Sequence, residues 1–94
     1  MEQCKVSREV RIVNTRGLHA RASAKFVTVV SQLPPGVDVR VAKDGNEAAG
    51  GSILGLMMLG AAMGDTIEVI VSGDDAPQVL DELCDLVVNG FGED

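Results

Sequence analysis

The strongest constraint on the fold is the strict alternation of apolar and polar side chains in residues 37–43, VDVRVAK. Successive side chains of a β-strand point to opposite faces of a sheet, so this pattern predicts a strand with one buried face. Residues 66–71, TIEVIV, repeat the alternation and place Ile67, Val69 and Val71 on one side. The chain is therefore expected to form a sheet that packs through one face only.

Two further strands are predicted on either side of the first helical segment. In residues 5–13, Val6, Val10 and Ile12 share one face, and Arg8 interrupts the apolar series. The sequence Asp-Gly-Asn at residues 44–46 is typical of a tight turn. Residues 47–50 are therefore predicted to return along residues 37–43 as the second strand of a hairpin.

Three helices are predicted from apolar side chains at helical spacing. The first covers residues 20–31 and is stopped by Pro34, and its apolar stripe consists of Ala22, Phe26, Val29 and Leu33. The second covers residues 53–59, with Ser52 at its N-cap. The third is expected to be capped by residues 72–75, to accept Pro77 in its first turn and to end at Asn89-Gly90. A short acidic tail is expected to follow.

The predicted order of elements is βαββαβα, in the α+β class. The rules for hairpins and crossovers favour one four-stranded, mostly antiparallel sheet with the three helices on one face. Ninety-four residues suffice for one hydrophobic core, so residues 1–94 are expected to form a single domain.

Composition and charge narrow the possible functions. The chain has no Trp or Tyr and two Phe, which implies an aliphatic core and no aromatic platform for bases. Residues 1–43 contain all eight basic side chains and three acidic ones, whereas residues 44–94 contain eleven acidic side chains. The basic part suits an acidic protein surface or a phosphoryl group. The acidic remainder would repel nucleic acid, which is therefore not expected as a partner.

The cysteines and the absence of long apolar segments suggest a cytoplasmic protein. Cys4 and Cys84 form no CxxC motif and no metal-ligand set, so no metal site is expected. A disulfide between them stays open at this point, although reduced thiols are the preferred interpretation. Residues 1–5 lack the apolar run of a signal peptide, and no segment approaches the ~18 apolar residues of a membrane span.

The candidate functional residue is His19, the one histidine of the chain. It stands where a glycine-containing loop, residues 14–18, gives way to the first predicted helix. Arg16, Arg21 and Lys25 are close to it in sequence. A helix N-terminus beside basic side chains can hold an anion, and histidine supplies a neutral nitrogen nucleophile near neutral pH.

Two sequence motifs are specific enough to compare with a known family: residues 17–26, GLHARASAKF, and residues 51–62, GSILGLMMLGAA. The first resembles the active-site signature of the HPr family, the histidine-containing phosphocarrier proteins of the bacterial phosphotransferase system, and the second resembles that family's regulatory-serine helix. The resemblance extends over nearly the whole chain and implies the family's open-faced β-sandwich. Ala22 stands where many members have proline, and Gly51 stands where a basic residue often precedes the serine. The first departure puts little in doubt, whereas the second leaves recognition by a serine kinase open.

The resemblance implies a role for each candidate residue. His19 is expected to accept the phosphoryl group on Nδ1, and Arg21 is expected to neutralise it. Ser52 is implied as a site for a regulatory serine kinase/phosphorylase, but a simple helix cap explains this serine equally well. Docking of enzyme I and IIA proteins is expected at Arg16, Ile53, Leu54 and Met57. Lys25 and Arg16 are also compatible with ordinary solvated charges.

The implied function is that of a monomeric phosphoryl carrier without a cofactor, and not of an enzyme. The HARASAKF form looks proteobacterial and leaves open whether the carrier serves sugar transport or a nitrogen-related regulatory relay. A ferredoxin-like domain that binds small molecules shares the element order but does not explain the two motifs. A phosphatase-like enzyme is disfavoured because the sequence shows no general acid or base near His19.

Overall fold

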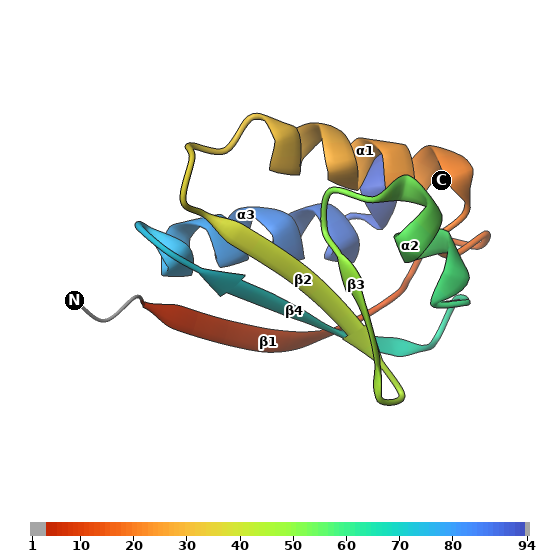
Figure 1. The fold of residues 1–94 in the computed structure, drawn as a ribbon. Helices are drawn as coiled ribbons and strands as arrows, with labels where there is room; N and C mark the ends of the chain where they lie inside the picture. Colours follow the sequence, from red (N-terminus) through yellow and green to blue (C-terminus); the bar gives the residue numbers. More distant parts are fainter. Residues whose placement is uncertain (1–3, 94) are drawn as a thin grey trace.

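The computed structural model describes residues 4–93, which form one four-stranded sheet with helices on one side (Figure 1). The strands are β1 (Lys5–Arg11), β2 (Asp38–Lys43), β3 (Asn46–Ala49) and β4 (Thr66–Ser72). Their order in the sheet is β1-β4-β2-β3, and every neighbouring pair is antiparallel. The structure thus confirms the predicted sheet.

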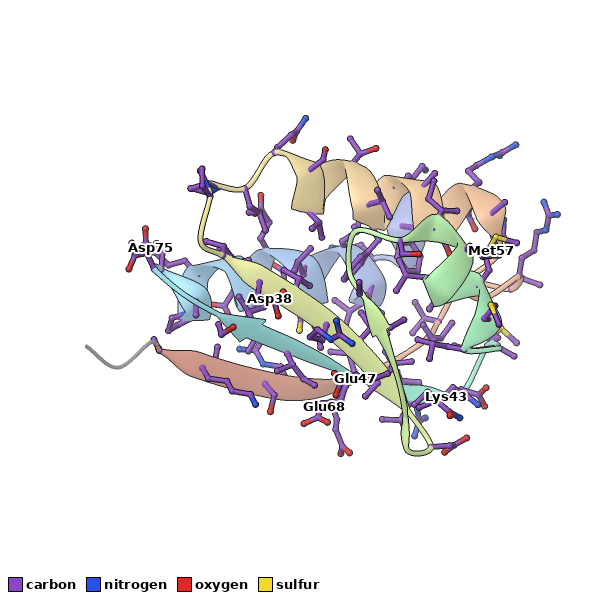
Figure 2. All side chains as sticks on the ribbon, in the orientation of Figure 1. Asp38, Lys43, Glu47, Met57, Glu68 and Asp75 are labelled. Atoms are coloured by element: carbon purple, nitrogen blue, oxygen red, sulfur yellow. The ribbon has the colours of Figure 1, made fainter. Side chains whose placement is uncertain are left out.

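The alternation in β2 and β4 sorts the side chains between the two faces. Val39 and Val41 of β2 are buried opposite Val71 and Val69 of β4. On the other face, Ala42 of β2 pairs with Glu47 on one side and Glu68 on the other. Because paired residues point to the same side, this open face carries acidic side chains (Figure 2).

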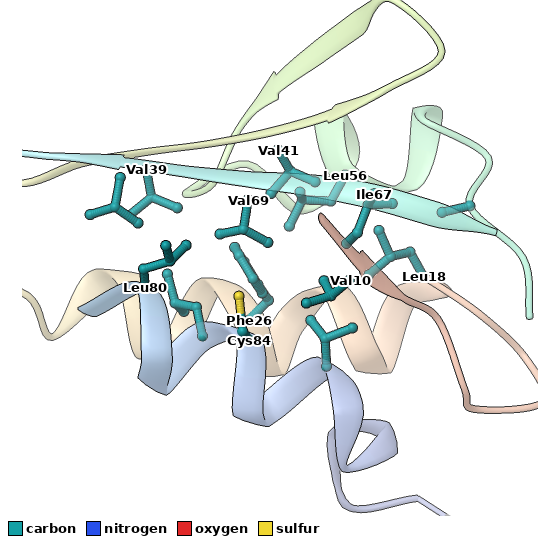
Figure 3. Close-up of a cluster of buried hydrophobic side chains, with 14 of the residues drawn as sticks. Val10, Leu18, Phe26, Val39, Val41, Leu56, Ile67, Val69, Leu80 and Cys84 are labelled. Carbon is teal, nitrogen blue, oxygen red and sulfur yellow. The ribbon is translucent and has the colours of Figure 1, made fainter. Parts of the chain in front are cut away.

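The helices α1 (Ala20–Ser31), α2 (Ile53–Met58) and α3 (Ala76–Val88) all cover the buried face of the sheet. Within the predicted stripe of α1, Ala22 and Phe26 are fully buried, while Val29 and Leu33 are half-buried against the core. The core is mainly aliphatic, and Figure 3 shows Phe26, Leu56, Leu80 and Cys84 meeting the valines of the sheet.

The interruption of β1 at Arg8 has a structural explanation. Arg8 lies in an edge strand, and its Nη2 donates to Oδ1 of Asp81 in α3 at 2.6 Å. A long side chain at an edge can place its charged end in water while its stem covers the helix. The polar residue in an apolar series therefore connects β1 to α3.

The end of β1 and the start of α3 differ from what the sequence predicts. β1 ends at Arg11, and not at residue 13, because the segment that leads into its partner strand β4 turns at Gly64, whose φ is +92°. At the start of α3, Asp75 occupies the N-cap position with φ of 57°, and its side chain makes no capping bond. The N-cap therefore falls within residues 72–75, as predicted, but the left-handed Asp75 caps the helix through its backbone carbonyl oxygen alone, and Ser72 belongs to β4.

The short acidic tail predicted after Asn89-Gly90 packs against the body of the protein. After Asn89 the chain forms a 3-10 turn, η1 (Gly90–Gly92), in which Phe91 is only 1% exposed. An aromatic side chain is too apolar to remain in water when a core surface is within reach. Burial of Phe91 therefore holds the end of the described chain against the body of the protein.

Two other expectations concern the cysteines and membrane spans. Cys4 is exposed and Cys84 is buried, and both are free thiols. Within residues 4–93, none of the helices has the length and apolar character needed to traverse a bilayer.

Candidate functional site

His19 is the N-cap residue of α1. Its backbone is extended, with φ of −77° and ψ of −177°, and its carbonyl oxygen accepts from the Ser23 N–H at 2.9 Å. Its ring nitrogen Nδ1 accepts from the Arg21 N–H at 3.3 Å. The first N–H groups of a helix have no partner within the helix. The imidazole of His19 therefore caps α1, as a Ser or Asp side chain commonly does at other helices.

The loop before His19 is fixed by a close approach of two backbones. The Leu18 N–H donates to the Ala61 carbonyl oxygen at 3.0 Å. At Gly17, φ is +66°, and an added Cβ would lie 2.3 Å from the same oxygen. Only glycine fits both constraints, so Gly17 sets the path of the chain into His19.

The second ring nitrogen of His19 meets a carboxylate from the far end of the chain. Glu93 Oε2 lies 2.8 Å from His19 Nε2, and both side chains are 15% exposed. The Asn14 Nδ2 donates to the other Glu93 oxygen, Oε1, at 3.1 Å and to the Gly17 carbonyl oxygen at 2.8 Å. Asn14, His19 and Glu93 thus form one hydrogen-bonded cluster.

The surroundings of Glu93 favour its charged form. Burial on its own would raise the pKa of Glu93. Hydrogen bonds from Asn14 and His19, together with the nearby positive charge of Lys25, outweigh burial and lower this pKa. Glu93 is therefore an ionised carboxylate near neutral pH.

Glu93 and Asn14 are site residues that sequence reasoning missed. One available signal was Phe91, because a phenylalanine is out of place in a solvated acidic tail. A carboxylate touches the His19 ring, although residues 10–37 contain no acidic side chain that could have indicated it.

The predicted basic residues surround an open hollow next to His19. Arg16, Arg21 and Lys25 line it together with Glu93, and its volume is about 460 Å³. Lys25 has a further role that its sequence position did not reveal. Its Nζ donates to the Phe91 carbonyl oxygen at 2.7 Å, so Lys25 also anchors the turn that carries Glu93. Three cations beside a helix N-terminus can accommodate a divalent anion.

The structure places α2 next to this site. Ala61, which bonds the His19 loop, follows the C-terminal end of α2, and α1 and α2 are in contact. Exposed apolar side chains cover α2 and the segment after it: Ile53, Leu54, Met57, Met58 and Met63. Figure 2 shows Met57 at the end of the molecule where α1 begins. The three apolar docking candidates are therefore accessible, whereas Leu56 is buried and Leu59 half-buried.

Ser52 begins α2, at the opposite end from Ala61. Its Oγ accepts from the Gly55 N–H at 2.9 Å, and the side chain is half-buried. The predicted N-cap is confirmed. His19, Arg16 and Arg21 come together in one site, and Ser52 lies apart from it along α2.

Comparisons with known proteins agree with this geometry. Residues 6–89 match the family described as PTS HPr component phosphorylation site. The chain is 42% identical over 88 residues to the phosphocarrier protein HPr of Neisseria meningitidis serogroup A, covering 94% of this chain and 97% of that protein. It is 38% identical over 89 residues to the phosphocarrier protein NPr of Shewanella violacea, covering 95% and 96% of the two chains.

A solved structure gives the same result. The phosphocarrier protein HPr from Bacillus anthracis superposes with a TM-score of 0.82 at 31% identity, covering 89% of this chain and 98% of that one. The fold, the motif around His19 and these matches lead to one conclusion. The chain belongs to the HPr family of phosphocarrier proteins of the phosphotransferase system.

Proposed function

We propose that the protein accepts a phosphoryl group on Nδ1 of His19 from phosphorylated enzyme I and donates it to a IIA protein. The observation that carries this proposal is the Arg21 N–H, which donates to Nδ1 at 3.3 Å. A nitrogen that accepts a hydrogen bond has a lone pair and no proton, which is what a nucleophile needs. Nδ1 is thus an unprotonated nitrogen with a lone pair, placed at the N-terminus of α1.

The site suits a phosphoryl group that must leave again. Transfer adds negative charge beside the first N–H groups of α1, whose dipole contributes about 1 kcal/mol of stabilisation at a partly exposed site. Arg21, with Arg16 beside it, neutralises further charge in the hollow and in the transfer transition state. The hollow is open, so the phosphoryl group stays accessible to the next protein.

We assign this protein the role of a carrier without turnover of its own or a cofactor. Among the described residues, Glu93 supplies the carboxylate that contacts the ring, and it is bonded to Nε2 and Asn14, which leaves it engaged rather than free to activate water at Nδ1. Residues 1–94 act, in this proposal, as one monomeric domain in the cytoplasm.

The docking surface is assigned to Ile53, Leu54 and Met57, with Arg16 at its basic edge. These apolar side chains are exposed beside the His19 loop. Flexible apolar side chains can adapt to several partners in turn. Enzyme I and the IIA proteins are proposed to use this same surface one after the other.

Ser52 is proposed as a regulatory phosphorylation site for an HPr serine kinase/phosphorylase. A phosphate there would add about two negative charges next to Ile53 and Leu54. Acidic partners would then dock less well. Incubation with such a kinase and ATP should label the wild type and leave Ser52→Ala unlabelled.

The function is tested by incubating the protein with enzyme I and labelled phosphoenolpyruvate. The wild type and Ser52→Ala should take up a label that acid removes, because a phosphorylated imidazole is acid-labile and a phosphoserine is not. His19→Ala should take up none. A label that persists in His19→Ala, or that resists acid, would refute the assignment.

The IIA protein that accepts the phosphoryl group determines whether this carrier serves the sugar branch or the nitrogen branch of the phosphotransferase system. The relatives named above include both an HPr and an NPr. Transfer from the phosphorylated protein to purified IIA proteins of the sugar branch and of the nitrogen branch, measured side by side, assigns it to one of them.

A further inference from the structure

We propose that Glu93 is a positioning residue for phosphoryl transfer through His19, an inference that rests on the proposed function. Its carboxylate keeps the ring proton on Nε2, so that Nδ1 stays free, and it balances the charge that the ring gains when Nδ1 is phosphorylated. The juxtaposition that carries the inference is the 2.8 Å contact between Glu93 Oε2 and His19 Nε2.

The partners of the two ring nitrogens determine where the proton lies. Nδ1 accepts from the Arg21 N–H, and Nε2 faces a carboxylate oxygen, which can only accept. The neutral ring that satisfies both contacts carries its proton on Nε2. A carboxylate that orients a histidine in this way fixes both the tautomer and the plane of the ring.

The geometry also fits the charge balance of the reaction. When the Nδ1 lone pair forms the new N–P bond, the bond between the donor and phosphorus breaks, and the donor keeps that electron pair. No proton leaves the ring, which now carries phosphorus on Nδ1 and hydrogen on Nε2 and is a cation. Glu93 then faces a positive ring instead of a neutral one, and the hydrogen bond becomes charge-assisted.

The neighbouring positive charges explain why the phosphorylated ring needs a negatively charged side chain at Nε2. Arg16, Arg21 and Lys25 line the hollow that receives the phosphoryl group, and all three repel a cationic ring. Within the described residues of this cluster, Glu93 is the group that offsets them at Nε2. The burial of Phe91 and the bond from Lys25 to its carbonyl oxygen hold Glu93 in place.

The experiment uses the full chain labelled with ¹⁵N-histidine, which gives one imidazole to observe. Each variant is equilibrated with enzyme I at a fixed ratio of phosphoenolpyruvate to pyruvate, and the phosphorylated fraction is measured. Glu93→Gln keeps an oxygen that can accept from Nε2 but removes the charge. We expect it to lower the equilibrium constant for phosphorylation about tenfold, as a charge-assisted bond becomes a neutral one. Glu82→Gln, which removes an exposed carboxylate from α3, should leave the constant unchanged.

Ring spectra separate positioning from stability. In the unphosphorylated wild type, the ¹⁵N signals should show hydrogen on Nε2 with slow exchange, whereas Glu93→Ala should show fast exchange and a mixture of tautomers. Thermal unfolding controls for loss of structure. An equilibrium constant for Glu93→Gln within twofold of the wild type, or unchanged ring signals in Glu93→Ala, would overturn the inference. If the wild type itself takes no phosphoryl group, the proposed function fails, and the ring signals still decide whether Glu93 positions the imidazole.

Discussion

At the scale of single residues, His19 combines a structural and a chemical task in one ring. Nδ1 caps α1 through the Arg21 N–H, and the same nitrogen is the proposed phosphoryl acceptor. Once a phosphoryl group occupies Nδ1, its oxygens can accept from that N–H in place of the ring. The start of the helix therefore keeps a partner in both states, which removes one cost of reversible phosphorylation.

Gly17→Ala should destabilise the protein more than an ordinary glycine replacement. A side chain at Gly17 meets both a left-handed backbone and the Ala61 oxygen, with Cβ 2.3 Å away. We expect a loss of about 2–4 kcal/mol in the free energy of unfolding, measured in urea. Gly45→Ala is the matched control, because its φ is +85° but nothing lies within 4 Å of the added Cβ.

The Gly45→Ala control should cost only about 1–2 kcal/mol, since the backbone preference alone is lost. Equal losses in the two variants would show that the contact between Gly17 and Ala61 contributes little.

The residues of the site differed in how far the sequence could predict them. His19, Arg16 and Arg21 are neighbours in the chain, so one motif contained them all. Glu93 follows His19 by 74 positions, and no local pattern connects the two. From the sequence, Lys25 was compatible with an ordinary solvated charge, because its bond to the Phe91 carbonyl oxygen depends on the same distant turn.

At the scale of elements, α2 depends on its surroundings. A helix of six residues is too short to be stable in water alone. It is held by the Ser52 cap, by the buried Leu56 and by the segment that bonds the His19 loop. Its exposed face is therefore free to carry the apolar side chains that we propose as a docking surface.

Ser52→Ala should loosen α2 without removing the phosphoryl acceptor. The Gly55 N–H loses its partner, which typically costs about 1 kcal/mol. Hydrogen exchange in residues 53–58 should become faster, and labelling by enzyme I should persist. Ser52→Asp should keep slow exchange because aspartate also caps helices, and Ser7→Ala, an exposed serine in β1, serves as the control. Unchanged exchange in Ser52→Ala would show that the cap is dispensable.

The elements themselves were largely predictable, and their exceptions have tertiary causes. The alternation of β2 and β4 and the stripe of α1 are local patterns that burial reinforces. The entry to α3 is different, because a Cβ at Gly73 would lie 2.4 Å from the Gly36 carbonyl oxygen. This close approach of two loops requires glycine at residue 73, and no pattern in residues 72–75 shows that Asp75 adopts a left-handed conformation without a side-chain capping bond.

At the scale of the whole molecule, the division of charge along the sequence is kept in part, although Arg8, Arg40 and Lys43 form ion pairs with acidic residues of the second half. Arg16, Arg21 and Lys25 gather at the hollow by His19, whereas Asp81, Glu82 and Asp85 lie exposed on α3. The strand order β1-β4-β2-β3 was not predictable from local patterns, because both hairpin and crossover orders suit the same alternation. This order helps to bring the two motifs, 35 residues apart at His19 and Leu54, to one end of the protein.

Leu54→Glu should weaken docking while leaving the fold intact. Leu54 is 67% exposed, so its loss should hardly change the free energy of unfolding. Burying a leucine at an interface contributes about 1.5–3 kcal/mol, so we expect the rate of labelling at limiting enzyme I to fall at least tenfold. Gln78→Glu adds the same charge at an exposed site in the first turn of α3 and should label at the normal rate. Equal rates for the two variants would move the docking surface away from α2.

The central claim, that Nδ1 of His19 is the phosphoryl acceptor, is tested most directly by ¹⁵N spectroscopy of the phosphorylated protein. The chain has a single histidine, so ¹⁵N-histidine labelling leaves no ambiguity about the residue. After incubation with enzyme I and phosphoenolpyruvate, Nδ1 should show coupling to phosphorus, and Nε2 should keep its hydrogen. Coupling at Nε2, or a phosphorylated protein whose imidazole signals are unchanged, would contradict the account.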